Sequence, residues 1–183
     1  MNILITILLI LACSIALFLL IAIFMKKDHY VKREIIINAP KQKVFDYLKL
    51  LKNQDKFNKW AKADPNRKWE YKGTDGAVGF IISWSGNKKA GEGEKEITNI
   101  IEGQRIETQI RFIKPMKMVA DVVMETESLS DNKTKVSLSN SGTLNYPMNI
   151  FIPVAEKNFP KDMDESLYTL KNILEDNSNF AII

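Results

Sequence analysis

The stretch QRIETQIRFIKPMKMVADVVMETE, residues 104–127, decides the fold class of this chain. Apolar and polar residues alternate from Arg105 to Phe112, which is the period-two pattern of a strand with one covered face. Lys114 and Pro115 interrupt this pattern, and a second strand-like run follows over 116–127. Two strands joined by so short a connection pair as an antiparallel hairpin. The stretch therefore predicts an antiparallel sheet with one face toward solvent.

The sequence continues in the same way on both sides of this hairpin. Turn residues separate further strands that are predicted at 67–71, 78–85, 91–101 and 133–146. Together with the hairpin they form a meander of six antiparallel strands. One more strand, rich in β-branched residues, is predicted much earlier, over 32–37.

Helical patterns lie before and after the meander. Asn38 to Pro40 ends the early strand, and helices are predicted over 41–51 and 54–60. A long helix is predicted over 160–175, with Met163, Leu167, Leu170, Ile173 and Leu174 on one face, and it is expected to cover the sheet. Pro153 and Pro160 predict an irregular or kinked stretch before it.

Residues 3–25 carry no charge and form a helix of about 34 Å, long enough to cross a bilayer. A signal peptide would need a basic start and a small-residue cleavage site. A lipoprotein signal ending at Cys13 would be followed by a polar linker, and a core helix is rarely apolar all round. We therefore predict a single-pass anchor over 1–27, a domain over 28–176 and a frayed tail over 177–183. Lys26 and Lys27 predict that the domain is cytoplasmic.

Composition excludes several classes of function. The net charge is +4 with both signs interspersed, which is not the footprint of a nucleic-acid-binding protein. The single cysteine, Cys13, lies in the predicted span, and the single histidine, His29, lies outside the predicted sheet. Zinc sites, disulfides and Cys/His or Ser/His/Asp nucleophiles are therefore excluded, and no cofactor is expected. Glu92, Glu94 and Glu96 share one strand face, which we interpret as solvated because burying unpaired carboxylates is costly.

The order of these elements, with IINAP over 36–40 and the helix start KQKVFDYL over 41–48, resembles the polyketide cyclase/dehydrase-like group of the START/Bet v 1 (SRPBCC) superfamily. Further similarities are Lys59-Trp60, the GEG step over 91–93 and the closing LYTLKNILE over 167–175. The resemblance covers about 31–175. It implies an α+β helix-grip fold, in which a curved antiparallel β-sheet wraps around a long C-terminal helix, here with an added N-terminal transmembrane helix.

The resemblance also implies a cavity for an apolar or amphipathic ligand. The residues expected to line it are Trp60, Phe80, Ile82, Trp84, Thr108, Ile110, Phe112, Met118, Val122, Met124 and Tyr146. Met and aromatic side chains adapt to irregular apolar ligands, although they also fill ordinary cores. Trp60 and Tyr146 would supply its polar contacts.

Three functions remain open. The leading hypothesis is a membrane-anchored, non-catalytic module that binds a hydrophobic small molecule or lipid and contacts the bilayer through residues 3–25. The second is a cyclase or dehydratase, which two or more buried ionisable groups around an open cavity would favour. The third is a membrane-tethered protein-interaction module, which a filled core and a broad exposed apolar patch would favour.

Overall fold

The computed structural model describes residues 2–176, apart from the side chains of Lys62 and Ala63. The predicted tail over 177–183 lies outside the described residues. The elements in chain order are α1 (Ile3–Phe24), β1 (Asp28–Ile37), α2 (Lys41–Lys49), α3 (Leu51–Phe57), the 3-10 helix η1 (Lys59–Ala63), β2 (Lys68–Lys72), β3 (Ile81–Ser85), β4 (Glu92–Ile101), β5 (Arg105–Lys114), β6 (Met118–Ser130), β7 (Lys133–Thr143), the 3-10 helix η2 (Met148–Phe151) and α4 (Ile152–Asp176).

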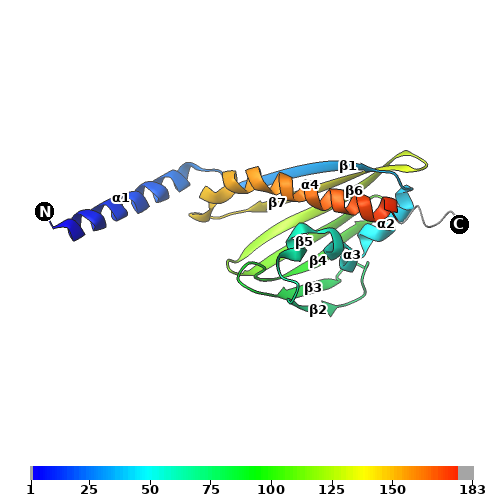
Figure 1. Ribbon diagram of the computed structural model, residues 1–183, viewed down its shortest axis with the longest axis horizontal. Helices are drawn as coiled ribbons and strands as arrows, with labels where there is room; N and C mark the ends of the chain where they lie inside the picture. The colour runs from blue at the N-terminus through cyan, green and yellow to red at the C-terminus, as the bar shows by residue number, and fades with distance from the viewer. Residues whose placement is uncertain (1, 177–183) are drawn as a thin grey trace.

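All seven strands form one antiparallel sheet in the order β1-β7-β6-β5-β4-β3-β2. The sheet is curved, and α4 lies along its covered face (Figure 1). Strands β2 to β7 follow one another as neighbours, and β1 closes the other edge beside β7. The predicted α+β fold, with a long C-terminal helix against a curved antiparallel sheet, is confirmed.

The strand register gives the domain two distinct ends. His29, Gly142, Ala120, Ile110 and Lys95 are successive paired neighbours across five strands, from β1 to β4. This row lies close to the place where α1 leads into β1, and the turns over 86–91 and 115–117 lie beyond it. We call this the α1 end. The turns over 102–104 and 131–132 and the helix α2, which contacts β6, lie at the opposite end, which we call the α2 end.

The α2 end is filled by apolar side chains. Phe45 and Leu48 of α2 are fully buried and belong to the same core cluster as Leu170 and Leu174 of α4. The apolar spacing on both helices places these residues toward each other. A smaller cluster, with Leu51 and Phe80 at its centre, lies under the other edge of the sheet.

Several predicted boundaries are wrong, two of them by four residues or more. β1 begins at Asp28 rather than at residue 32, because its polar first residues pair with β7 up to Thr143. α4 begins at Ile152 rather than at residue 160, and the stretch before residue 160 is helical instead of irregular. Pro153 occupies the first helical turn, where no backbone N–H is required, and Pro160 is accommodated inside the helix.

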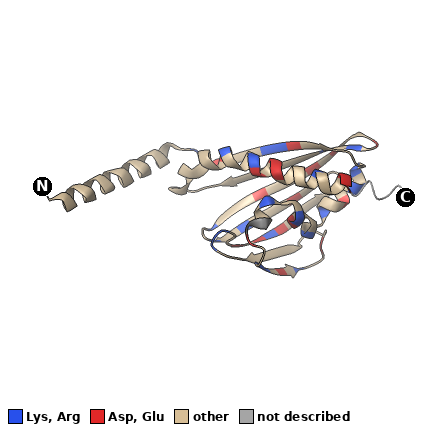
Figure 2. Ribbon diagram, in the orientation of Figure 1, with Lys and Arg blue, Asp and Glu red and all other residues tan. Residues whose placement is uncertain are grey.

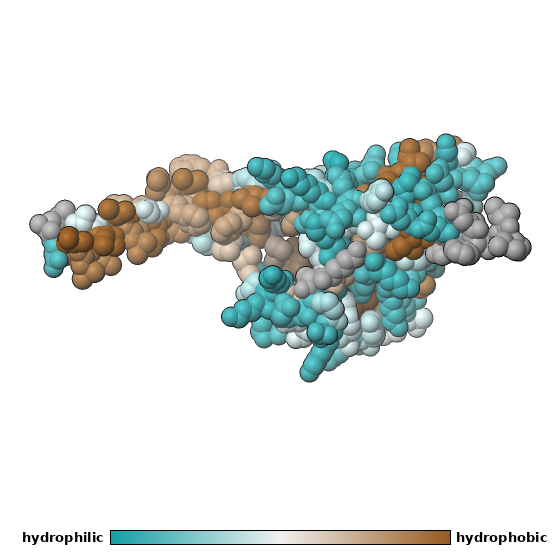
Figure 3. All heavy atoms as spheres, in the orientation of Figure 1, coloured by the Kyte–Doolittle hydropathy of each residue, from teal (hydrophilic) through white to brown (hydrophobic). Residues whose placement is uncertain are grey.

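α1 is 22 residues long, has a mean hydropathy of 3.2 and is long and apolar enough to cross a membrane. Figure 2 shows it without charged residues, and Figure 3 shows its hydrophobic surface. Its length and composition are shared by membrane spans and signal sequences.

Candidate functional site

A cavity of about 370 Å³ lies between α4 and the covered face of the sheet, at the α1 end. Eight of the eleven residues expected to line a ligand cavity do line it. These are Trp60, Ile82, Trp84, Ile110, Phe112, Met118, Val122 and Met124. They come from η1, β3, β5 and β6, and Phe159 and Met163 of α4 face them. The walls are therefore mostly apolar.

The other three expected residues lie outside the cavity. Phe80 is 2% exposed and stacks on Tyr71 with the two ring centroids 6.4 Å apart. Thr108 is buried, and its hydroxyl donates a hydrogen bond to the Val122 carbonyl at 3.2 Å. Tyr146 follows the end of β7 and is 46% exposed. Strand alternation assigned Phe80 and Thr108 to the correct face, but only the packing decides which inward residues meet empty space.

Two glycines leave room for large rings on the cavity floor. A Cβ on Gly93 would lie 2.6 Å from the Trp84 ring, and a Cβ on Gly142 would lie 2.8 Å from the His29 ring. Each ring therefore lies across the neighbouring strand, in the space that a side chain would fill. The Trp84 indole N–H donates to the Ala90 carbonyl at 3.1 Å, which holds its ring in this position.

One end of the cavity is polar and contains Lys95. Its ammonium donates a hydrogen bond to the side-chain oxygen of Gln54 at 2.5 Å, and the Gln54 amide donates to the Leu48 carbonyl at 2.8 Å. Burial lowers the pKa of Lys95 from 10.5 to about 8, although the Asp55 carboxylate opposes this shift. Lys95 is half-buried and forms part of the cavity wall.

Asp55 and Arg67 also line this end of the cavity. Burial raises the pKa of Asp55, while the positive charges of Lys95 and Arg67 lower it. Burial lowers the pKa of Arg67, whose guanidinium lies 4.0 Å from the centre of the Trp69 ring and donates to the Ala61 carbonyl. Burial thus disfavours the charged form of all three side chains, and their mutual interactions partly offset this effect.

Sequence reasoning overlooked Lys95, although the signal was present. Glu94 and Glu96 face outward and pair with Arg111 at 2.6 and 2.7 Å, and Glu92 pairs with Lys114 at 2.9 Å. Because successive residues of a strand point to opposite faces, the lysine between two outward carboxylates must point inward. An inward lysine on a covered sheet face is unusual enough to identify a candidate site.

The prediction that His29 lies outside the sheet is wrong. His29 is the second residue of β1, is 4% exposed and lines the cavity. Its Nε2 is hydrogen-bonded to Asn140 Oδ1 at 2.9 Å, and its ring meets Phe159 edge-on. Its Nδ1 has no hydrogen-bond partner in the part of the chain that the structure describes. The His29 ring therefore forms part of the cavity wall, and its Nδ1 is buried without a protein partner among the described residues.

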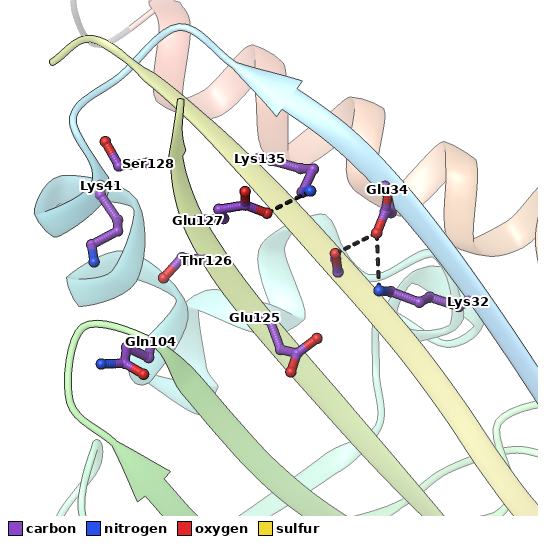
Figure 4. Close-up of a pocket in the computed structure, with 10 residues that line it drawn as sticks. Lys32, Glu34, Lys41, Gln104, Glu125, Thr126, Glu127, Ser128 and Lys135 are labelled. Carbon is purple, nitrogen blue, oxygen red and sulfur yellow. Dashed lines mark hydrogen bonds and ion pairs between the residues drawn. The ribbon is translucent and has the colours of Figure 1, made fainter. Parts of the chain in front are cut away.

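A second depression, of about 420 Å³, lies on the outer face of the sheet and is entirely polar in character (Figure 4). Two of its lysines pair with two of its carboxylates: Lys32 lies 3.0 Å from Glu34, and Lys135 bonds to Glu127. Three lysines and three glutamates leave it without net charge. Such mutually paired groups are typical of a solvated surface, so we do not assign a ligand to it.

No group of three or more His, Cys, Asp or Glu side chains within residues 2–176 is arranged to hold a metal ion. No family model matches the sequence. No curated protein matches it either.

Solved structures do resemble this fold. Norcoclaurine synthase from Thalictrum flavum, in complex with dopamine and hydroxybenzaldehyde, is 12% identical, with a TM-score of 0.61 over 81% of this chain and 87% of that chain. The Aha1 dimer from Colwellia psychrerythraea is 19% identical, with a TM-score of 0.54 over 80% of this chain and 96% of that chain. Ara h 8.0201 is 17% identical, with a TM-score of 0.51 over 79% and 99%. These similarities show that about four fifths of the chain adopts a Bet v 1-like helix-grip fold.

Proposed function

We propose that this chain is a membrane-anchored protein that binds an amphipathic small molecule or single-chain lipid in the helix-grip cavity. The observation that carries the proposal is the cavity itself: about 370 Å³, with apolar walls and a polar end at Lys95. Empty space of this size is uncommon in a packed domain interior, where cavities are few and small. Its volume lies near the lower end of the range of about 300–1,000 Å³ found for small-molecule sites, which favours a compact or single-chain molecule over a two-chain lipid.

The polar end indicates how the ligand is oriented. The ionisable side chains at this end are the basic Lys95 and Arg67 and the acidic Asp55, a formal excess of one positive charge. An apolar body therefore lies along the sheet, and an anionic or hydrogen-bond-accepting group lies at Lys95. A charge in this partly desolvated place favours an anion more than it would at the surface.

Membrane anchoring is supported by the way the domain holds α1. Asn149 is fully buried, and its side-chain amide donates to the carbonyls of Ala22 and Met25 at 2.6 and 3.0 Å. Removal of α1 as a signal sequence would expose this asparagine and leave its donors without these partners. Lys26 and Lys27 at the helix exit support a cytoplasmic domain.

Native mass spectrometry of the full chain, released from detergent micelles in the presence of decanoate, tests the binding proposal. We expect one decanoate per chain. Val122→Phe fills the cavity and should reduce occupancy at least tenfold, whereas Leu129→Phe, at an exposed position of the same strand, should leave it unchanged. Equal occupancy in the two variants, or none in the wild type, would contradict the proposal.

A cyclase- or dehydratase-type enzyme is a second candidate, and Lys95 and Asp55 favour it. Burial lowers the pKa of the lysine to about 8 and raises that of the aspartate, so both values shift toward neutral pH. Two titratable groups shifted in this way are suited to exchange protons with a substrate. The open cavity opposes the third hypothesis, a protein-interaction module, for which we expected a filled core.

Reductive trapping with benzaldehyde and cyanoborohydride at pH 7 tests whether Lys95 is available as an amine. A pKa of about 8 leaves roughly a tenth of Lys95 uncharged at pH 7, a few hundred times more than for a lysine of pKa 10.5. Peptide mapping should therefore find Lys95 modified well before the exposed Lys117. Equal rates at the two lysines would remove the support for the enzyme candidate.

A further inference from the structure

Side chains of the domain pack against the last turns of α1. Phe18 meets Phe151 with the ring centroids 6.4 Å apart, and Ala22 is 1% exposed. Lys26 forms an ion pair with Glu156 of α4 at 2.7 Å. In addition, the side-chain amide of Asn149 donates hydrogen bonds to the carbonyls at the end of the helix. The direction of α1 therefore determines which surface of the domain is turned toward a membrane.

Exposed apolar side chains surround the α1 end of the domain. We call this set the apolar rim: Ile113, Val119, Tyr146, Phe151 and Val154, with exposed fractions from 45% to 56%. The first two lie on the β5–β6 hairpin, and the others lie around η2 and the start of α4. Figure 3 shows hydrophobic surface that continues from α1 onto the adjoining part of the domain. A tyrosine and a phenylalanine beside an apolar helix are suited to the interface between headgroups and acyl chains.

The charges near this rim are mostly positive. The lysines at the α1 end are Lys26, Lys27, Lys88, Lys89, Lys114, Lys117 and Lys157, all exposed. The acidic side chains beside them are bound to partners: Glu92 to Lys114, Glu156 to Lys26, and Asp28 to the Thr143 hydroxyl at 2.6 Å. Lysines around an apolar rim are complementary to an anionic lipid surface.

The mouth of the cavity opens beside the same rim. Among the residues that line the cavity, Trp60 and Lys89 are the exposed ones, and Met118 lies at the base of the β5–β6 hairpin. The opposite direction is closed by the core around Phe45 and Leu170. A ligand therefore enters from the α1 end.

We propose that the α1 end of the domain docks on the headgroup region of an anionic bilayer through its apolar rim and lysines, so that the cavity mouth faces the membrane. This inference rests on the proposed anchoring by α1. It adds that the domain contacts the membrane surface instead of being separated from it by water. The ligand then passes between bilayer and cavity without crossing bulk water.

Nitroxide accessibility of the full chain in phosphatidylcholine/phosphatidylglycerol vesicles tests the proposal. The native Cys13 is labelled in the wild type, and Val119→Cys and Leu129→Cys are each labelled in a Cys13→Ser background. Val119 and Leu129 are a matched pair on β6, 45% and 46% exposed, at the α1 end and the α2 end respectively. We expect the label at residue 119 to be at least fivefold more accessible to oxygen, relative to a water-soluble nickel complex, than the label at residue 129.

Each failure has its own signature. If the label on Cys13 is buried in the bilayer while those at residues 119 and 129 are equally accessible to nickel, α1 anchors the chain but the domain does not dock. If the label on Cys13 itself is accessible to nickel, the proposed anchoring fails and the docking fails with it. Dipolar broadening between labels at residue 119, without protection from nickel, would indicate contact with a second copy of the chain and would overturn the docking on lipid.

Discussion

Replacing Lys95 with methionine tests the electrostatic account of the cavity most directly. Methionine keeps an unbranched apolar side chain, one heavy atom shorter, and removes the charge. Burial lowers the pKa of Lys95 from 10.5 to about 8. Because each tenfold change in proton affinity corresponds to 1.36 kcal/mol, the charged lysine costs the folded state about 3 kcal/mol relative to the unfolded chain.

The sign of the pH dependence follows from proton linkage. Below pH 8 the lysine is charged in both states, so the folded protein bears the full cost. Between pH 8 and 10.5 the unfolded chain binds more protons than the folded chain, so the free energy of unfolding of the wild type rises with pH. From pH 7 to pH 10 the wild type should gain about 2–3 kcal/mol relative to Lys95→Met. The two proteins share every other titratable group. The difference between their free energies of unfolding therefore isolates the titration of Lys95.

At pH 7 a separate effect reduces the advantage of the variant. The side-chain oxygen of Gln54, which is 3% exposed, loses its hydrogen bond to Lys95, and an unsatisfied buried acceptor costs about 1–3 kcal/mol. This cost does not depend on pH. The change with pH in the stability difference between the two proteins is therefore more decisive than the difference at any single pH.

The assay is urea unfolding of the full chain in detergent micelles, followed by tryptophan fluorescence at pH 7, 8.5 and 10. Lys117→Met, at an exposed lysine, is the control and should differ from the wild type by a constant amount. If the difference between wild type and Lys95→Met is also constant, within about 0.5 kcal/mol across this range, the burial of the Lys95 charge is refuted.

Three further predictions follow from the same contacts. Gly93→Ala would place a methyl group 2.6 Å from the Trp84 ring and should destabilise the domain by about 1–3 kcal/mol in urea unfolding; an unchanged midpoint would contradict this ring position. Asn149→Ala removes both side-chain hydrogen bonds to the end of α1 and should cost about 1–3 kcal/mol in the same assay, whereas a loss below about 0.3 kcal/mol would show that α1 is loosely tethered. Asp55→Asn removes the carboxylate that raises the pKa of Lys95, so that pKa should fall further and benzaldehyde trapping at pH 7 should become faster; slower trapping would mean that Asp55 acts mainly as a proton acceptor.

The architecture was predicted from the periodic spacing of apolar residues along single strands and helices. Alternation over 105–112 and the helical spacing of Leu167, Leu170 and Leu174 correspond to faces that are buried in the structure. Element boundaries were less secure. The first residues of β1 are polar and resemble a linker, and only pairing with β7 makes them a strand.

The candidate site was predictable to the level of the sheet face. Ile82, Ile110 and Val122 were expected to face a cavity because strand alternation fixes direction, and they line it. The same rule applies to Lys95, because its neighbours Glu94 and Glu96 point outward. His29 could not have been found, since its role depends on a ring that crosses to Gly142 on a strand more than a hundred residues away.

The sequence by itself determined the two features that depend on neighbouring residues: an apolar segment long enough to cross a bilayer, and an antiparallel meander covered by an amphipathic helix. Hydrophobic length and periodicity are local properties, so they can be read without coordinates. The tertiary structure alone decided which inward side chains border empty space, how Lys95 and Asp55 shift one another's pKa, and how Asn149 holds α1. Those properties depend on distances between residues that are far apart in the chain, and only packing sets such distances.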